Sequence, residues 1–341
     1  MHKLSKHAEH LLRIVEAFPR VTVTVLGDLV ADEFVFGEIS RVSREAPVLI
    51  LKHRERTIVP GGGANAVYNL ADLGVTVLPV GVVGDDEPGR ALIQCFRSKR
   101  IPLSGILKLK GHTTVTKTRI LAGHTHTQRQ QVVRIDRESA ELPDAKVRRR
   151  LAALAREYAE ASDALLVSDY GYGAATPEML TAVRVKQALN GVPITLDSRY
   201  RLLAYSGVTA ATPNQAEVEA VLNVEIGNDS ERLRATGKTL QQRMKLDSLL
   251  ITRGRHGMVA FKRGRKPVEI PIYGSDQVAD VTGAGDTVIA AFTAALAAGA
   301  STEEAARLAN YAGGIVVMKR GTATVTRNEL ERAIRSEHAA G

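Results

Sequence analysis

The segment Asp280–Thr287 combines glycines with a carboxylate directly before an alanine-rich apolar stretch. Its glycines, Gly283 and Gly285, permit a tight turn, and the first amides of the following helix would point unpaired N–H groups and the positive end of the helix dipole at an anion. The spacing matches neither the P-loop nor the dinucleotide fingerprint. Asp286 would lie in the first helical turn, where it is either a helix cap or a general base beside the bound anion.

Two further polar runs accompany this segment. In the first, the glycines 61–63 and Asn65 predict either a turn or a close approach of a ligand to the backbone, with the asparagine amide recognising hydroxyl groups. In the second, Asn214 and Glu217 lie three residues apart on one face of the following helix. They form either a helix cap or a pair that holds magnesium-bound water and phosphate oxygens.

Short apolar runs alternate with helical stretches along most of the chain. The runs are 21–26, 75–83, 164–168, 193–196, 209–211 and 248–252. This alternation predicts an α/β fold with a mainly parallel sheet, whose ligands lie outside the carboxyl ends of the strands. Polar residues such as Asp28, Asp169 and Asp197 follow directly after those runs.

Two stretches, within residues 33–60 and 113–136, instead alternate apolar and polar residues. We expect them to form antiparallel strands inserted in the α/β body, as a small sheet that covers the site as a lid. The chain has no low-complexity linker and no internal repeat, so residues 1–341 are expected to be one domain.

The composition excludes several classes of protein. With 341 residues, 44% hydrophobic and 24% charged, the chain can bury a large core. Its single cysteine, Cys95, rules out an internal disulfide or a cysteine-rich zinc site and favours a cytoplasmic location. No apolar run approaches the roughly 20 residues that span a bilayer, and residues 1–20 lack the core of a signal peptide, so we expect no membrane association.

The net charge of +9 favours an anionic partner. Nucleic acid is disfavoured, because only 4% of the residues are aromatic, there is no Trp, and the basic runs are short. A phosphorylated small molecule is therefore the expected ligand. A non-catalytic nucleic-acid-binding protein remains the alternative from another class.

Together these segments resemble the ribokinase-like (PfkB) carbohydrate kinases. The resemblance rests on the glycine element 62–69 and on Asp280–Thr287, and it extends over about residues 21–325. Within that superfamily the chain is most similar to the heptose 7-phosphate kinase domain of the ADP-heptose synthesis enzymes, through residues 27–28, 40–48, 168–170, 212–217 and 280–289. The resemblance implies a three-layer α/β fold. It also implies a stand-alone kinase, because the 341 residues leave no room for the nucleotidyltransferase domain of the bifunctional members.

The resemblance implies a role for each segment. Asp286 would be the base that takes the proton from the attacking sugar hydroxyl, while backbone amides stabilise the transferred phosphoryl group. Those amides belong to Gly283, Ala284 and Gly285. The sugar would contact Asp28, Gly61, Gly62, Gly63, Asn65 and Asp169. ATP would contact Asn214, Gln215, Ala216, Glu217, Thr252, Arg253, Gly254, Gly257, Asn310 and Gly314, and Glu217 would reach Mg²⁺ through water.

The predicted lid strands contain two arginines, Arg119 and Arg134, that are candidates for the acceptor's own phosphate, because a guanidinium fork suits phosphate oxygens. Ordinary surface charge is the other interpretation. The expected cofactors are ATP and Mg²⁺. The exposed edges of a lid sheet further suggest a homodimer.

The chain departs from the heptose kinase pattern at two positions. Tyr172 and Arg199 stand where those kinases usually have lysines. Because lysine and arginine hold phosphate differently, these departures leave two acceptors open. The first is O1 of D-glycero-D-manno-heptose 7-phosphate, which would yield the 1,7-bisphosphate, and the second is another sugar or sugar phosphate, as in a ribokinase or fructokinase.

Overall fold

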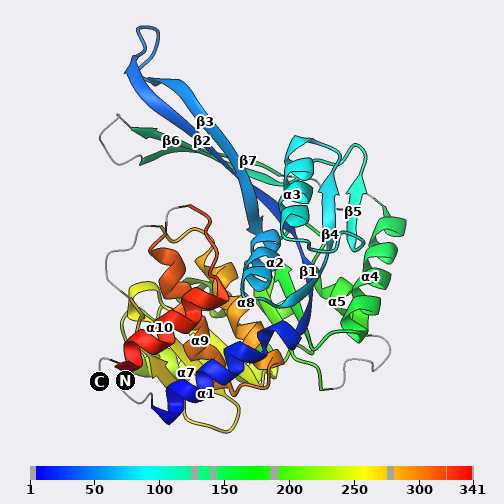
Figure 1. Cartoon of the computed structure of the whole chain (residues 1–341), viewed down its shortest axis with the longest axis vertical. Coiled ribbons are helices and arrows are strands. Elements are labelled where there is room, and N and C mark those ends of the chain that lie inside the picture. Colours follow the sequence, from blue (N-terminus) through cyan, green and yellow to red (C-terminus); the bar gives the residue numbers. More distant parts are fainter. Residues whose placement is uncertain are drawn as a thin grey trace.

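A nine-stranded sheet forms the centre of the molecule, in the order β13-β12-β11-β10-β9-β8-β1-β4-β5 (Figure 1). The computed structural model describes residues 5–123, 130–138, 142, 144–184, 191–274, 280–319 and 321–339. Neighbouring strands from β11 through to β5 pair parallel, and only the pairings of β12 and β13 are antiparallel. The predicted α/β fold with a mainly parallel sheet is confirmed.

The strands of this sheet are short and apolar because both of its faces are buried. Leu249 and Ile251, for example, pack on one side and Leu250 on the other. The bounds are β1 Thr22–Gly27, β4 Thr76–Gly84, β5 Ile106–Leu109, β8 Ala164–Asp169, β9 Ile194–Ser198, β10 Ala210–Ala211, β11 Ser248–Thr252, β12 Met258–Lys262 and β13 Val268–Ile270.

Helices cover both faces and complete the three layers. One face packs against α1 Lys6–Ala17, α2 Gly63–Asp72, α3 Glu87–Ser98, α8 Ala284–Ala297, α9 Thr302–Val317 and α10 Arg327–Ala339. The other packs against α4 Ala145–Glu160, α5 Pro177–Arg184, α6 Gln215–Leu222 and α7 Ser230–Met244. The alanine-rich α8 lies between α2, α9 and the sheet, and its small side chains allow this close packing. None of the helices in the described ranges has the length and apolarity needed to cross a membrane.

A second sheet, of order β3-β2-β6-β7, projects from this body (Figure 1). Its strands are β2 Leu29–Val42, β3 Leu49–Gly62, β6 Thr116–Gly123 and β7 Gln130–Arg137, so both predicted stretches contribute to it. The pairs β2–β3 and β6–β7 are antiparallel, as expected, whereas β2 and β6 pair parallel. Each stretch forms its own antiparallel pair, and the two pairs join through their first strands. We call this sheet the lid.

Candidate active site

The N-terminus of α8 has the features of an anion site. Gly283 caps the helix at a φ of 77°, and a Cβ there would lie 2.5 Å from Asn65 Nδ2, so only glycine fits. The N–H of Ala284 donates to the Val281 carbonyl at 3.2 Å. The N–H of Gly285, by contrast, has no acceptor within the described ranges, and a Cβ at Gly285 would meet no atom within 4 Å. An unpaired helix amide thus borders open space.

Asp286 follows directly and is buried, with 3% of its surface exposed. The Tyr170 hydroxyl donates to Oδ1 at 2.7 Å, and Asn65 Nδ2 donates to Oδ2 at 3.0 Å. Burial raises the pKa of Asp286 to about 6, and these two hydrogen bonds oppose that rise. The carboxylate is therefore ionised at neutral pH and close enough to its pKa to accept a proton during turnover.

Asn65 connects α2 to this carboxylate. Its Nδ2 also donates to the Gly283 carbonyl at 3.3 Å, and its Oδ1 accepts from Asn69 Nδ2 at 3.1 Å. The Thr287 hydroxyl then donates to Asn69 Oδ1 at 3.1 Å, which links α8 back to α2. Asn65, which we expected to recognise sugar hydroxyls, thus directs its amide hydrogens at the base and at the helix cap.

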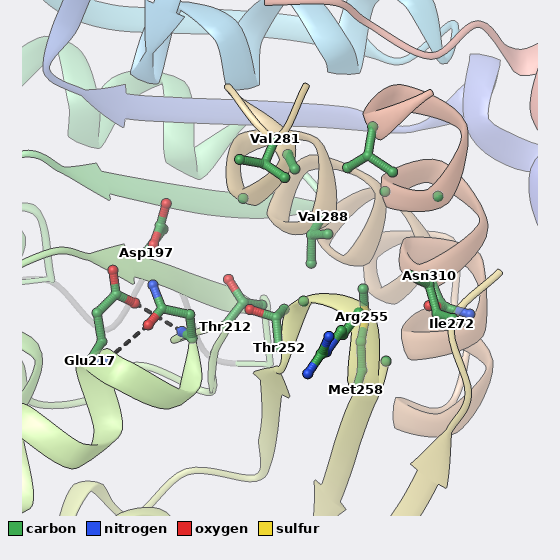
Figure 2. A pocket seen from close by; sticks show the side chains of 18 of the residues that line it. Asp197, Thr212, Glu217, Thr252, Arg255, Met258, Ile272, Val281, Val288 and Asn310 are labelled. Carbon is green, nitrogen blue, oxygen red and sulfur yellow. Dashed lines mark hydrogen bonds between the residues drawn. The ribbon is translucent and has the colours of Figure 1, made fainter. Parts of the chain in front are cut away.

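A cavity of about 630 Å³ adjoins the start of α8 (Figure 2). Its lining includes Ala284 and Gly285 and, from the predicted ATP set, Asn214, Glu217, Thr252, Gly254, Gly257, Asn310 and Gly314. Gln215, Ala216 and Arg253 are not in the lining. Arg253 Nε instead donates to Gln215 Oε1 at 3.0 Å, which braces the start of α6 behind the cavity. A volume of this size suits a nucleotide-sized ligand.

The two ends of the cavity differ in chemistry. Figure 2 shows Asp197 and Glu217 at one end, and Asn310 and Ile272 at the other. At the acidic end, Asn214 and Glu217 form a reciprocal cap of α6, in which each side chain accepts from the other's backbone N–H at 2.9 Å. The cap is therefore confirmed. Because Asn214 and Glu217 also line the cavity, capping the helix does not prevent the pair from contacting a ligand.

The acidic end also fits the donor set that Mg²⁺ prefers. Burial raises the pKa of Glu217 and holds that of Asp197 well above its usual range. A cation bound between the two carboxyl groups would lower both pKa values and so favour the ionised forms. The Thr212 hydroxyl beside them is buried without a hydrogen-bond partner. Nowhere in the described ranges do three His, Cys, Asp or Glu side chains form an ion site. Phosphate and water oxygens would complete the coordination, as is usual for Mg²⁺.

The two carboxylates expected to contact the sugar have partners within the chain. Asp28 accepts from the backbone N–H groups of Tyr170, Tyr172 and Ala174 at 2.9, 3.0 and 2.8 Å, and burial raises its pKa to about 6. Asp28 therefore shapes the loop that follows β8.

Asp169 is equally occupied. Its buried carboxylate forms an ion pair with the half-buried Arg201, whose Nε lies 3.1 Å from Oδ2, and accepts from Ser198 Oγ and the Tyr205 hydroxyl at 2.9 Å each. These bonds anchor the loop after β9, on which Arg199 lies. Asp169, like Asp28, therefore positions a loop, and a contact of either carboxylate with the sugar stays a prediction.

The glycines at 61–63 are explained by packing inside the chain. A Cβ at Gly61 would lie 2.7 Å from the Asp32 carboxylate, and one at Gly63 would lie 2.9 Å from the Asp28 carbonyl. Gly62 has a φ of 53°, and a Cβ there would lie 3.3 Å from the Tyr170 ring. The sequence predicts that another group approaches the backbone of these glycines closely, and in the structure atoms of the chain itself do so. A contact of these glycines with sugar stays a prediction.

The lid arginines are register partners on β6 and β7, so they share one face. Arg119 forms an ion pair with Asp32 at 2.6 Å, and its side chain is 12% exposed. Arg134 donates through Nε to Asp136 at 2.7 Å. Each predicted phosphate ligand thus already has a carboxylate partner.

Four further side chains lie near Asp286 or line the adjoining cavity: Lys117, Tyr170, Asp197 and Arg199. The sequence reasoning missed Lys117 as a site residue and noted the other three only by their places in the chain. Lys117 alternates with Arg119 on the same strand, a period-two signal that could have revealed it. The others follow strand ends, where ligands of parallel sheets lie.

Residues 25–329 match the family model described as pfkB family carbohydrate kinase. The chain belongs to this family. Curated relatives of this pfkB kinase include the bifunctional protein HldE of Pelobacter propionicus, which is 39% identical over 92% of the chain and 63% of the relative. HldE of Geobacter sulfurreducens is 38% identical over 94% of the chain and 64% of the relative. The pfkB kinase thus spans less than two thirds of these relatives.

Solved structures confirm the ribokinase-like fold. Ribokinase of Arabidopsis thaliana, complexed with ribose and ATP, matches with a TM-score of 0.72 and 20% identity, covering 92% of this chain and 99% of that one. Phosphofructokinase-2 of Escherichia coli, complexed with substrates and products, matches with a TM-score of 0.73 and 19% identity, covering 93% and 99%. Family membership makes the chain a sugar kinase, an enzyme that transfers phosphate to a hydroxyl group.

Proposed function

We propose that this pfkB kinase transfers the γ-phosphoryl group of ATP to O1 of D-glycero-D-manno-heptose 7-phosphate and so supplies the 1,7-bisphosphate for ADP-heptose, a precursor of the lipopolysaccharide core. The observation that supports transfer is the position of Asp286, a buried base one residue after the Gly285 amide that borders the 630 Å³ cavity. The HldE relatives at 38–39% identity support heptose as the acceptor class.

The chain's own groups account for the main demands of phosphoryl transfer, which are positioning and charge stabilisation. Asp286 removes the proton of the attacking hydroxyl, while Asn65 and Tyr170 hold its carboxylate in place. The Gly285 amide and the dipole of α8 stabilise the charge that develops on the transferred group. When bound, Mg²⁺ would neutralise phosphate charge, and Asp197 and Glu217 are the residues placed to hold it and its waters.

A second acceptor class is favoured by two side chains. Arg199 lines the cavity, and the Tyr172 hydroxyl lies 3.4 Å from Glu138, at the positions where heptose kinases have lysines. A different sugar or sugar phosphate would suit this exchange while the transfer machinery is retained.

Magnesium-dependent ADP release, measured with an acceptor panel, tests the proposal. The panel is heptose 7-phosphate, fructose 6-phosphate, ribose and fructose, each assayed with the wild type and with Asp286→Asn. We expect turnover only with heptose 7-phosphate and a loss of about 10²- to 10⁴-fold in the variant. Turnover with another panel member alone would assign that acceptor, and full activity of the variant would refute Asp286 as the base.

We also propose a homodimer that forms through the lid, in the cytoplasm, where ATP is available. The edge strand β7 is exposed along its whole length and presents Val133 and Ile135, which are 47% and 54% exposed. A sheet edge with apolar side chains is suited to pairing with a second copy. Light scattering should give a dimer mass for the wild type and a monomer mass for the double variant Val133→Ser and Ile135→Ser.

A further inference from the structure

The lid contains a largely buried cation, Lys117, for which the described ranges show no carboxylate partner. Lys117 on β6 is 7% exposed, and its Nζ lies 4.9 Å from the centre of the Tyr170 ring and 5.9 Å from that of Tyr172. In the parts of the chain that the structure describes, Nζ has no carboxylate within 4.0 Å and donates no hydrogen bond. A largely buried ammonium loses part of its hydration, and an anionic partner would compensate for that loss.

The neighbouring charges increase that cost. Burial lowers the pKa of Lys117, and Arg199 and Arg134 lower it further. The two nearby carboxylates, Asp32 and Asp136, which act in the opposite direction, are already bonded to Arg119 and Arg134. Lys117 is thus a cation on this face of the lid that has no carboxylate in direct contact within the described chain.

Tyr170 shows how Lys117 lies relative to the reacting centre. The ring of this tyrosine lies under the ammonium, and its hydroxyl donates to Asp286 Oδ1 at 2.7 Å. A single side chain therefore separates the cation from the base. Lys117 is absent from the lining of the 630 Å³ cavity, to which Arg199, Ala284 and Gly285 belong. Lys117 thus lies beside Tyr170, which lines the cavity, but outside the cavity itself.

We propose that Lys117 binds an anionic group of the acceptor itself, so that the enzyme selects a phosphorylated sugar over the same sugar without its phosphate. This inference rests on the proposed function and identifies the substrate class of that site. The phosphate would supply the missing counter-charge, and the Tyr170 ring would hold the ammonium over the site before the acceptor arrives. Arg119, which the sequence offered as a ligand for the acceptor's phosphate, is instead paired with Asp32 on the neighbouring strand β2.

Kinetic constants for paired acceptors test this assignment. Lys117→Met keeps the length of the side chain and removes its charge, and Lys52→Met on β3, an exposed lysine of the same sheet, is the matched control. With heptose 7-phosphate we expect KM to rise about 10- to 100-fold in Lys117→Met, as for a lost hydrogen bond between charged groups. The KM for ATP and the constants for unphosphorylated heptose should stay within about twofold. Equal losses with both acceptors, or a loss confined to kcat, would overturn the proposal.

Chemical labelling of the wild type gives a second test that does not depend on a variant's folding. Amine acetylation, followed by mass spectrometry of each lysine, should show Lys117 protected by heptose 7-phosphate but not by unphosphorylated heptose. Lys52 should be labelled equally in both samples. Protection of Lys117 by ATP alone, or by neither sugar, would contradict a role in binding the acceptor.

The acceptor panel separates the failure of this inference from that of the proposed function. If the wild type uses fructose 6-phosphate and not heptose 7-phosphate, heptose is wrong, and the Lys117 test proceeds with fructose 6-phosphate and fructose. If the wild type uses only unphosphorylated sugars, the Lys117 inference is wrong while the kinase assignment stands.

Discussion

Asp286 should set the acid limb of the pH–rate profile. Its pKa is raised to about 6, so only about a tenth of the molecules have an ionised base at pH 5, and kcat/KM for the acceptor should fall about tenfold per pH unit below 6. The buried carboxylate has two donors, and the shorter hydrogen bond comes from the Tyr170 hydroxyl at 2.7 Å. That bond favours the ionised form and so lowers the pKa.

Tyr170→Phe should therefore move the acid limb upward. A hydrogen bond to a charged group contributes about 1.5–3 kcal/mol, and one pKa unit corresponds to about 1.4 kcal/mol, so the expected shift is about 1 to 2 pH units. The assay is steady-state ADP release between pH 5 and 9 at saturating magnesium and ATP. Tyr172→Phe is the control, because the Tyr172 hydroxyl donates to Glu138 Oε1 at 3.4 Å and not to Asp286.

Two results would refute this reasoning. An acid limb that stays in place in Tyr170→Phe would mean that the hydrogen bond does not tune the base. An acid limb that persists in the residual activity of Asp286→Asn would mean that a different group titrates. The second result would direct attention to Asp197, whose carboxyl is buried at the acidic end of the cavity.

Three further predictions concern the site and its supports. Gly285→Ala should raise the KM for ATP at unchanged melting temperature, because a Cβ there meets only open space, whereas Gly283→Ala should destabilise the fold by about 1–2 kcal/mol through its φ of 77°. Arg201→Ala should lower the free energy of unfolding in urea by about 1–3 kcal/mol, since it leaves the buried Asp169 carboxylate with fewer donors. Asp286→Asn should raise the melting temperature at pH 8 and lose that advantage near pH 4. The raised folded-state pKa means that the wild type loses stability as the pH rises through about 6, and the variant has no such group. An equal gain at both pH values would contradict this account.

Local signals in the sequence identified most of the framework. Periodicity located the parallel strands and both stretches of the lid, because strand and helix patterns depend on neighbours a few residues away. The same holds for Asp286 and for Asn214 with Glu217, whose positions follow from the geometry of a helix N-terminus.

Contacts between residues remote in sequence could not be predicted from local patterns. The Asp28 carboxylate accepts hydrogen bonds from backbone amides 142 to 146 residues later in the chain. No local pattern distinguishes such a carboxylate from one that faces a ligand. Arg119 is likewise paired with Asp32, from which it is separated by 87 residues. The parallel pairing of β2 with β6 is long-range in the same way.

The sequence by itself thus determined the α/β fold, the family resemblance and the helix N-terminus at which we propose phosphoryl transfer, because backbone conformation and capping are local properties. Only the tertiary structure decided which charges remain available to a ligand. It paired Arg119 and Asp169 with neighbours of opposite charge and raised the pKa of Asp286 by burial. It also placed Lys117 over Tyr170 with no carboxylate in contact among the residues that the structure describes. Burial and charge pairing depend on which distant segments meet, and that is settled only when the chain folds.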